Sequence, residues 1–178
     1  MQVDEQMYGS LERGEHPTLR YERRLPHPPE KVWLALTEDP HLAAWFPTTI
    51  DGDRAAGASL RFRFERVDGI DPMVGEMLTY EPPSLLEFTW GGDRLRFELA
   101  PHAGGTALTF TVALEELGKA TRDGTGWHQC LDSLERSLAG DPTRPDDVDR
   151  WRELRELYAG RFGPEASTLG PPEALSAR

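Results

Sequence analysis

The chain has 178 residues, 38% of them hydrophobic, which is enough to bury one sizeable core but hardly two. Its 31 acids against 20 bases give a formal charge of −11, so a phosphate backbone or an anionic membrane would repel it. The single cysteine, Cys130, excludes an internal disulfide and fits a reducing compartment. No apolar run approaches the ~20 residues that cross a bilayer, and the acidic N-terminus is unlike a signal peptide. We therefore expect one soluble, cytoplasmic domain.

The first part of the chain predicts a strand followed by two short helices. Residues 1–17 follow neither the strand nor the helix period, and we expect them to form a loose N-terminal arm. From Thr18 to Leu25, apolar and polar residues alternate approximately, as in a half-buried strand. Pro28-Pro29 then favours the start of one helix, and Asp39-Pro40 favours the start of a second.

The middle of the chain predicts an antiparallel meander. Four segments alternate apolar with polar residues, and the pairs Pro82-Pro83, Gly91-Gly92 and Gly104-Gly105 supply turns between strands. The segment MVGEMLTY is a further strand, whose inward face the sequence does not assign because apolar residues fall on both sides. The apolar positions of the four alternating segments are Leu60, Phe62, Phe64, Leu86, Phe88, Trp90, Leu95, Phe97, Leu99, Leu108, Phe110, Val112 and Leu114.

The last part of the chain predicts two amphipathic helices. After Gly124 the apolar period becomes helical, and Gly140 is a natural stop for this long helix. Asp146 or Asp147 can cap a second helix, which we expect to reach about Gly160. The remainder, residues 164–178, is rich in Pro, Ala and Ser, and we expect it to be disordered. The apolar stripes of the two helices are Trp127, Leu131, Leu134 and Leu138, and then Trp151, Leu154, Tyr158 and Phe162.

This order of elements is not a βαβ pattern, so the long helix has to cover the concave face of the sheet. The expected fold is α+β, a curved antiparallel sheet around a long C-terminal helix. We expect residues 18–140 to form this domain, after the arm of residues 1–17. A linker and an appended helix over residues 141–163 follow, and then the tail.

Three segments in this order carry a family resemblance: EKVWLALTEDPHLAAWFP, GEMLTYEPPSLLEFTW and GWHQCLDSLERSLAG. They resemble the START-like superfamily, often abbreviated SRPBCC, and its branch named after the activator of the heat-shock-protein-90 ATPase. The resemblance covers roughly Thr18 to Phe162. It implies a helix-grip fold, START-like or Bet v 1-like, with a deep pocket, in a superfamily whose members bind lipids, hormones and polyketides or act on them. Fold alone does not assign a function, and the sequence shows no chaperone feature.

The apolar faces of the strands and of the long helix are expected to line an internal cavity. Aromatic residues at strand and helix spacing usually belong to a core, so we expect each side chain to pack in part and to line the cavity in part. The expected cavity residues are Trp45, Phe62, Phe64, Trp90, Phe97, Trp127, Leu131 and Leu134.

The sequence offers little for catalysis or for a cofactor. The five histidines are scattered, with no Cys-x-x-Cys or His-x-x-x-His pair, so neither a metal nor another cofactor is expected. The run Gly124-Thr-Gly126 lacks the third glycine of a dinucleotide fingerprint. His128, beside Trp127 at the expected mouth of the cavity, is the one weak catalytic candidate. A histidine one position off an apolar stripe is more often a half-exposed structural residue.

Three functions follow from these observations. The first is the binding of a small hydrophobic or amphipathic molecule in the apolar cavity, without catalysis. The second is a cyclase or dehydratase that acts on a hydrophobic carbonyl compound, with His128 moving a proton. The third is a protein-interaction or co-chaperone-like module, in which the helix at Trp151 or the N-terminal arm holds a partner or a second copy in a homodimer. Neither nucleic acid nor membrane insertion is expected.

Overall fold

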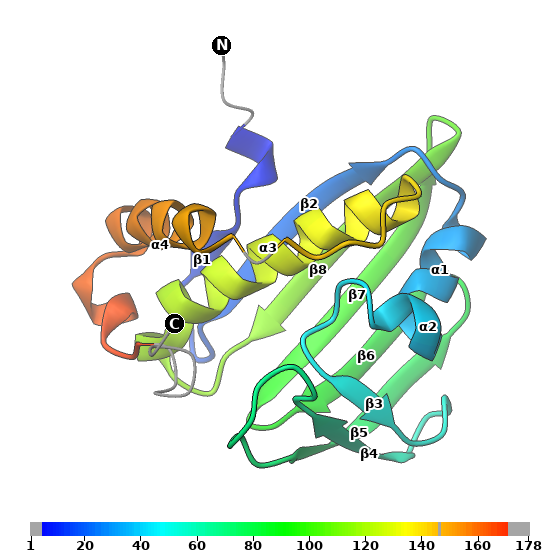
Figure 1. Ribbon diagram of the computed structural model, residues 1–178, viewed down its shortest axis with the longest axis horizontal. Coiled ribbons are helices and arrows are strands. Elements are labelled where there is room, and N and C mark those ends of the chain that lie inside the picture. The colour runs from blue at the N-terminus through cyan, green and yellow to red at the C-terminus, as the bar shows by residue number, and fades with distance from the viewer. Residues whose placement is uncertain (1–4, 146, 171–178) are drawn as a thin grey trace.

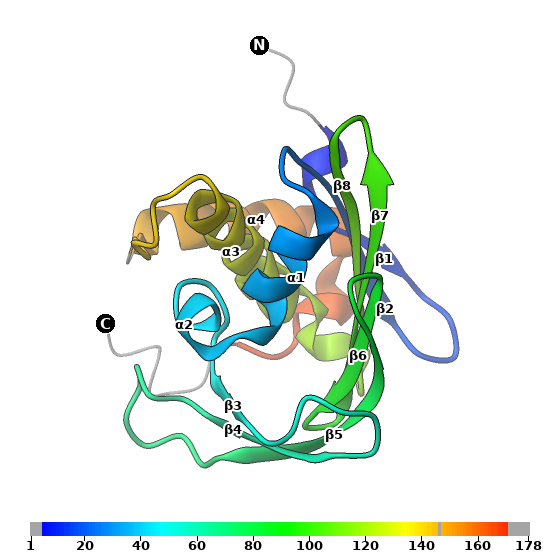
Figure 2. The ribbon, with the colours of Figure 1, turned by 90° about the vertical axis from the view of Figure 1, so that its right-hand side faces the viewer.

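The computed structural model describes residues 5–145 and 147–170, in which one curved antiparallel sheet wraps around a long helix (Figures 1 and 2). The eight strands described lie in the order β1-β2-β8-β7-β6-β5-β4-β3. They are β1 (Ser10–Glu12), β2 (Thr18–Leu25), β3 (Thr49–Asp51), β4 (Ser59–Arg63), β5 (Met73–Glu81), β6 (Leu85–Trp90), β7 (Asp93–His102) and β8 (Gly105–Ala113). The α-helices are α1 (Pro29–Thr37), α2 (Asp39–Leu42), α3 (Ala120–Leu138) and α4 (Val148–Phe162), and the 3-10 turns are η1 (Glu5–Met7), η2 (Leu117–Lys119) and η3 (Pro164–Ser167).

The helix-grip fold expected from the sequence is confirmed. Figure 2 shows α3 on the concave side of the sheet, with α1 and α2 on the same side. In the long pair β7–β8, Phe97 lies opposite Phe110 and Leu95 opposite Val112, and all four side chains are buried. Alternate residues of a strand point to opposite faces, so this register presents an apolar surface to α3.

The pairing of strand β5 explains why the sequence did not show which of its two faces points inward. Its pairing with β6 shifts between Met77 and Thr79, which marks a β-bulge. A bulge inserts one extra residue and turns the following side chains to the other face. Met77 is the buried hydrophobic residue of this strand, while Val74 is exposed.

Helix α3 starts four residues before the predicted position, at Ala120, and the expected opening at Gly124 is therefore wrong. Gly124 lies inside the helix where β2 and α4 approach it closely. A Cβ atom there would lie 3.2 Å from the ring of Phe162 and 3.6 Å from the side chain of Leu19. The glycine is required by this close approach rather than by a turn. The stop at Gly140 is confirmed, because this residue has a φ of 98°.

Helix α4 packs mainly against α3 (Figure 1), and its Tyr158 also reaches Tyr21 of β2. Asp147 caps it, because its Oδ1 accepts a 2.9 Å hydrogen bond from the Arg150 nitrogen. The other candidate cap, Asp146, lies outside the described residues. Leu154 and Tyr158 are at most 1% exposed, so the apolar stripe of α4 is covered within the same chain.

Both ends of the chain are more ordered than the sequence indicated. Residues 5–12, expected to be part of a loose arm, form η1 and β1, and β1 pairs with β2 at the sheet edge. A strand at a sheet edge can pair through its backbone whatever its side chains are. The alternation of apolar and polar residues therefore did not reveal β1. In the expected disordered tail, η3 buries Ala166 and the Leu169 nitrogen donates to the Gly118 oxygen. Residues 171–178 lie outside the described part of the chain.

Replacing Leu134, which is fully buried in α3, by alanine should reduce the free energy of unfolding by about 2–5 kcal/mol, as in other large-to-small core changes. Urea unfolding at neutral pH measures the effect. Leu34→Ala on α1 is the control, since that side chain is 43% exposed and its loss should cost less than about 0.5 kcal/mol. Equal effects of the two substitutions would mean that α3 does not fill the concave face.

Truncation after Asp141 should leave a protein that is less stable or aggregates, because it strips the α4 cover from α3. Size-exclusion chromatography and thermal unfolding would measure this. A shortened chain that stays folded, but is monomeric where the full chain is not, would assign α4 to association instead. A chain unchanged in both stability and size would show that the α4 contact contributes nothing.

Candidate functional site

Aromatic rings gather between α3 and the concave face of the sheet. Phe97 and Phe110 stack with their ring centroids 4.4 Å apart, and Phe110 lies 5.3 Å from Trp127 of α3. The Trp127 ring in turn lies 5.2 Å from Trp90 and 5.7 Å from Phe46. Distances of this size are typical of aromatic rings in direct contact. We call this cluster the aromatic interior and define it as Phe46, Phe62, Trp90, Phe97, Phe110 and Trp127.

The expected cavity residues gather as the sequence analysis anticipated, and their role as a ligand lining stays a prediction. Phe62 and Phe64 both lie against Trp90, at 6.5 and 6.1 Å between centroids. Leu131 and Leu134 are buried on α3. Trp45 contacts Phe46 at 5.3 Å and Phe97 at 6.1 Å. Two residues that contact Trp127, Phe46 and Phe110, were not among the expected cavity residues.

Trp90 differs from the other rings because its polar atom has no partner. It is partly exposed as a residue, yet its Nε1 is buried and forms no hydrogen bond within the described residues. Trp45, by contrast, donates its Nε1 hydrogen to the Ala35 oxygen at 2.8 Å. An indole N–H is a donor only, and leaving a buried donor unpaired is costly. Trp90 therefore offers a hydrogen bond that the described protein does not use.

A second unused polar group lies close in sequence to Phe46. Thr48 is 6% exposed, and its buried Oγ1 also has no partner within the described residues. Thr49, the first residue of β3, pairs with Arg63 of β4. Continuing that antiparallel register places Thr48 opposite Phe64, which contacts Trp90. Two unsatisfied buried groups thus belong to the same end of the aromatic interior.

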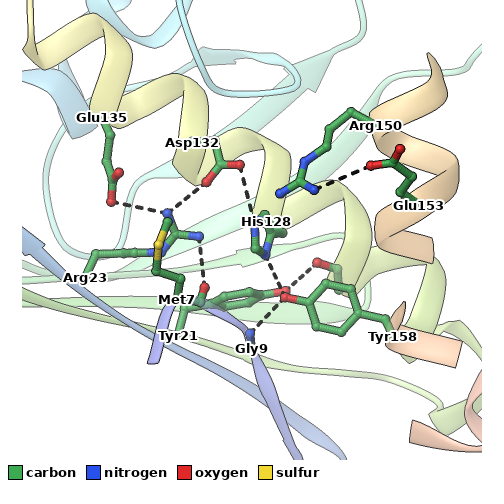
Figure 3. A network of polar contacts seen from close by, with 11 residues as sticks. Met7, Gly9, Tyr21, Arg23, His128, Asp132, Glu135, Arg150, Glu153 and Tyr158 are labelled. Atoms are coloured by element: carbon green, nitrogen blue, oxygen red, sulfur yellow. Dashed lines mark hydrogen bonds and ion pairs between the residues drawn. The ribbon is translucent and has the colours of Figure 1, made fainter. Parts of the chain in front are cut away.

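His128 contacts Tyr8, Tyr158 and Asp132 rather than the rings around Trp127, and Figure 3 shows it within a network of polar side chains. It is 1% exposed, so the expectation of a half-exposed residue is wrong. Its ring lies between those of Tyr8 and Tyr158, at 5.3 and 5.8 Å. The N-terminal segment and α4 cover this side of the helix, which is why a position one step off the apolar stripe is nevertheless buried.

Both ring nitrogens of His128 have partners. Nδ1 lies 2.8 Å from the Tyr158 hydroxyl, and Nε2 lies 3.4 Å from Asp132 Oδ2. The Tyr158 oxygen also accepts a 2.8 Å hydrogen bond from the Gly9 nitrogen. Asp132 accepts from the His128 Nε2 hydrogen, and Nδ1 and the Tyr158 hydroxyl share a second hydrogen bond, so both ring nitrogens are used. Burial raises the pKa of Tyr158 to about 12, so the hydroxyl keeps its proton.

Arg23 completes this polar network from β2. The arginine is 4% exposed and pairs through Nη1 with Asp132 at 2.9 Å and Glu135 at 3.2 Å. Its Nη2 donates to the Met7 oxygen at 3.1 Å. Burial alone would raise the pKa of Asp132, but the hydrogen bond from His128 and the interactions with Arg23 outweigh it, so this pKa is lowered. The network fastens the N-terminal segment and α4 to α3.

This geometry favours a structural role for His128. A general acid or base needs a free nitrogen or an exchangeable partner within reach of the substrate, and both nitrogens here are engaged away from the aromatic interior. The spacing of His128 and Asp132, four residues apart on one helix, was available in the sequence as a sign of this contact. Tyr158 and Arg23 are distant in the sequence and gave no such sign.

The other features that could carry a function are Cys130, a metal cluster, a membrane-spanning helix and the surface hollows. Cys130 is buried, as expected of a core residue, and burial raises the pKa of its thiol to about 11. Residues 5–145 and 147–170 contain no group of three His, Cys, Asp or Glu side chains suited to a metal, and no helix there is long and apolar enough to span a membrane. Two open surface hollows, of about 420 and 430 Å³, are lined by no residue of the aromatic interior.

Asp132→Asn should destabilise the protein at neutral pH, and the difference should shrink in acid. Because the folded pKa of Asp132 is lowered, its charge stabilises the fold above the unfolded value of about 3.9. This contribution is lost as the pH falls through the folded pKa. Unfolding free energies of both proteins, measured from about pH 7 down to about pH 3, test this. The exposed Asp149→Asn on α4 is the control, and a gap that is constant with pH would contradict the assignment.

The chain is similar to known proteins in sequence and in fold. The family model of activator of Hsp90 ATPase homolog 1-like proteins matches residues 26–139, from the end of β2 to the end of α3. The match begins just after β2 and leaves out β1, β2 and α4. The search of curated proteins gave no significant match.

Several solved structures share the fold. CalU16 from Micromonospora echinospora is 23% identical, with 86% of this chain and 96% of that chain covered and a TM-score of 0.69. A conserved protein of unknown function from Enterococcus faecalis is 20% identical, with 88% and 91% covered and a TM-score of 0.75. A protein from Bordetella parapertussis is 26% identical, with 86% and 90% covered and a TM-score of 0.66. The high coverage extends the similarity of fold beyond residues 26–139.

Proposed function

The chain belongs to the family of activator of Hsp90 ATPase homolog 1-like proteins, and from this we propose that it binds a small hydrophobic or amphipathic molecule between α3 and the sheet. The fold of this family fits a ligand-binding module. The observation that carries the proposal is the Nε1 of Trp90, which is buried among aromatic rings and has no hydrogen-bond partner in residues 5–145 and 147–170. A bound molecule with a hydrogen-bond acceptor would satisfy this donor and cover the rings.

The aromatic interior requires rearrangement to admit such a molecule. Its rings contact one another, so the ligand has to displace some of them or bind a more open state. Trp90 is the member best placed to move, because it is partly exposed while Phe62, Phe97 and Trp127 are buried. The end of the sheet that carries Trp90 is therefore the proposed entrance.

The two alternative functions receive less support from the described residues. For a cyclase or dehydratase, the catalytic candidate His128 has both nitrogens engaged on the far side of α3. For an interaction module or homodimer, the α4 stripe that motivated it is covered by α3. The absence of catalysis and a cytoplasmic location remain predictions.

The neutral fluorescent probe N-phenyl-1-naphthylamine should bind the purified protein saturably and quench its tryptophan emission. Trp90→Phe should remove the largest share of this quenching, because that ring lies at the proposed entrance. Trp151→Phe is the matched control, since Trp151 lies on α4 and stacks with Arg155. Native mass spectrometry of freshly purified protein should in addition reveal a co-purifying small molecule.

Two results would contradict this function. One is a probe signal that rises without saturation, as for nonspecific adsorption. The other is an equal loss of quenching in Trp90→Phe and Trp151→Phe, which would place the probe outside the aromatic interior.

A further inference from the structure

The segment between α3 and α4 carries a basic side chain to the Trp90 end of the aromatic interior. Figure 1 shows this segment running back along α3. From it, Arg144 Nη1 donates a 2.7 Å hydrogen bond to the main-chain oxygen of Phe46. The Phe46 ring lies 6.5 Å from Trp90 and 5.7 Å from Trp127. Phe46 thus links the guanidinium of Arg144 directly to the aromatic cluster.

The positive charge of Arg144 is not balanced by a carboxylate within residues 5–145 and 147–170. Its side chain forms no ion pair there, and the titratable groups that act on its pKa are the buried Cys130 thiol, which raises it, and another cation, Arg66, which lowers it. Burial and, to a lesser degree, Arg66 lower the pKa of Arg144. A partly buried cation without a counterion is unfavourable unless an anion or a set of acceptors completes it. Arg23, by contrast, is paired with two carboxylates.

Three polar groups lie around the Phe46 segment: the guanidinium of Arg144 on its main-chain oxygen, the buried hydroxyl of Thr48 two residues further on, and the buried Nε1 of Trp90, whose ring lies 6.5 Å from the Phe46 ring. We call them the head-group site. The indole and the guanidinium are donors only, and a threonine hydroxyl donates as readily as it accepts. Arg144 uses Nη1 for Phe46 and has further N–H groups in its planar fork. Such a set is complementary to an oxygen-rich, negatively charged group.

We propose that the head-group site binds the oxyanion of an amphipathic ligand, a carboxylate or a group of like charge, whose apolar body occupies the aromatic interior. This inference rests on the function proposed above and adds the charge and the orientation of the ligand. The head group lies against Thr48 and Arg144, and the body extends past Trp90 toward Phe97 and Phe110. Charge-assisted hydrogen bonds to an arginine fork are stronger than neutral ones, so the head group supplies selectivity.

Two probes that differ mainly in charge test the proposal. 8-Anilinonaphthalene-1-sulfonate carries an oxyanion, and N-phenyl-1-naphthylamine has the same ring framework without it. Arg144→Gln should weaken the binding of the sulfonate by about tenfold, as expected for loss of a hydrogen bond to a charged group. The neutral probe should bind this variant as it binds the unmodified protein. Thr48→Val, a nearly isosteric change, should also weaken the binding of the sulfonate probe.

Arg152→Gln controls for the general loss of a positive charge. Arg152 is an exposed α4 residue paired with Asp149, so its replacement should change neither affinity. Thermal unfolding of each variant checks that the fold is retained, and Arg144→Lys, which keeps the charge, should preserve most of the sulfonate affinity if Arg144→Gln proves unstable.

The outcomes separate this inference from the function on which it rests. If both probes bind saturably and Arg144→Gln affects neither or both equally, the head-group site is wrong and the apolar site stands. If Arg152→Gln weakens the sulfonate as much as Arg144→Gln does, the effect is general electrostatics and the head-group site is again wrong. If neither probe binds the unmodified protein, the proposed function itself fails.

Discussion

The burial of one face of α3 against the concave face of the sheet is the contact on which the other parts of the structure depend. Trp127 and Leu131 of α3 are at most 3% exposed. Without the helix, the inner rings of β7 and β8 would form a large apolar surface in water. The short strands β3 and β4 at the sheet edge rely on the same interior, since Ile50 and Phe62 pair there and bury their side chains.

The opposite side of α3 is buried by polar contacts rather than by apolar packing. There Asp132 pairs with both Arg23 and His128, and the Tyr158 hydroxyl accepts a hydrogen bond from the Gly9 nitrogen. A buried ionic network often adds little net stability, because desolvation offsets the attraction between charges. Its geometric requirements are nevertheless strict, so it fixes where the N-terminal segment and α4 lie. Helix α3 thus lies between the aromatic interior and the polar network of Arg23, His128 and Asp132.

The sequence predicts those parts of the fold whose signal is local. Strand alternation and the stripes of the two long helices are periodic within a few residues, and those elements were identified. Strand β1 was missed because its pairing with β2 uses the backbone, and the early start of α3 was missed because Gly124 looked like a helix opening. Tyr158, which covers His128, and Phe46, which binds Arg144, come from distant segments, so no local pattern predicts that His128 is enclosed or that Arg144 lacks a carboxylate partner within the described residues.

The aromatic interior is asymmetric in its polar groups, and in our proposal this asymmetry sets the direction of the bound molecule. At the α1 side, Trp45 is fixed by the Ala35 carbonyl and has no hydrogen bond left to offer. At the β3 side, Trp90 and Thr48 have buried polar atoms that find no partner in the part of the chain that the structure describes, and Arg144 adds a positive charge. The chain is acidic overall, but charges in solvent are screened within about 8 Å at physiological salt. Local donors rather than net charge therefore decide which end of a ligand lies against β3.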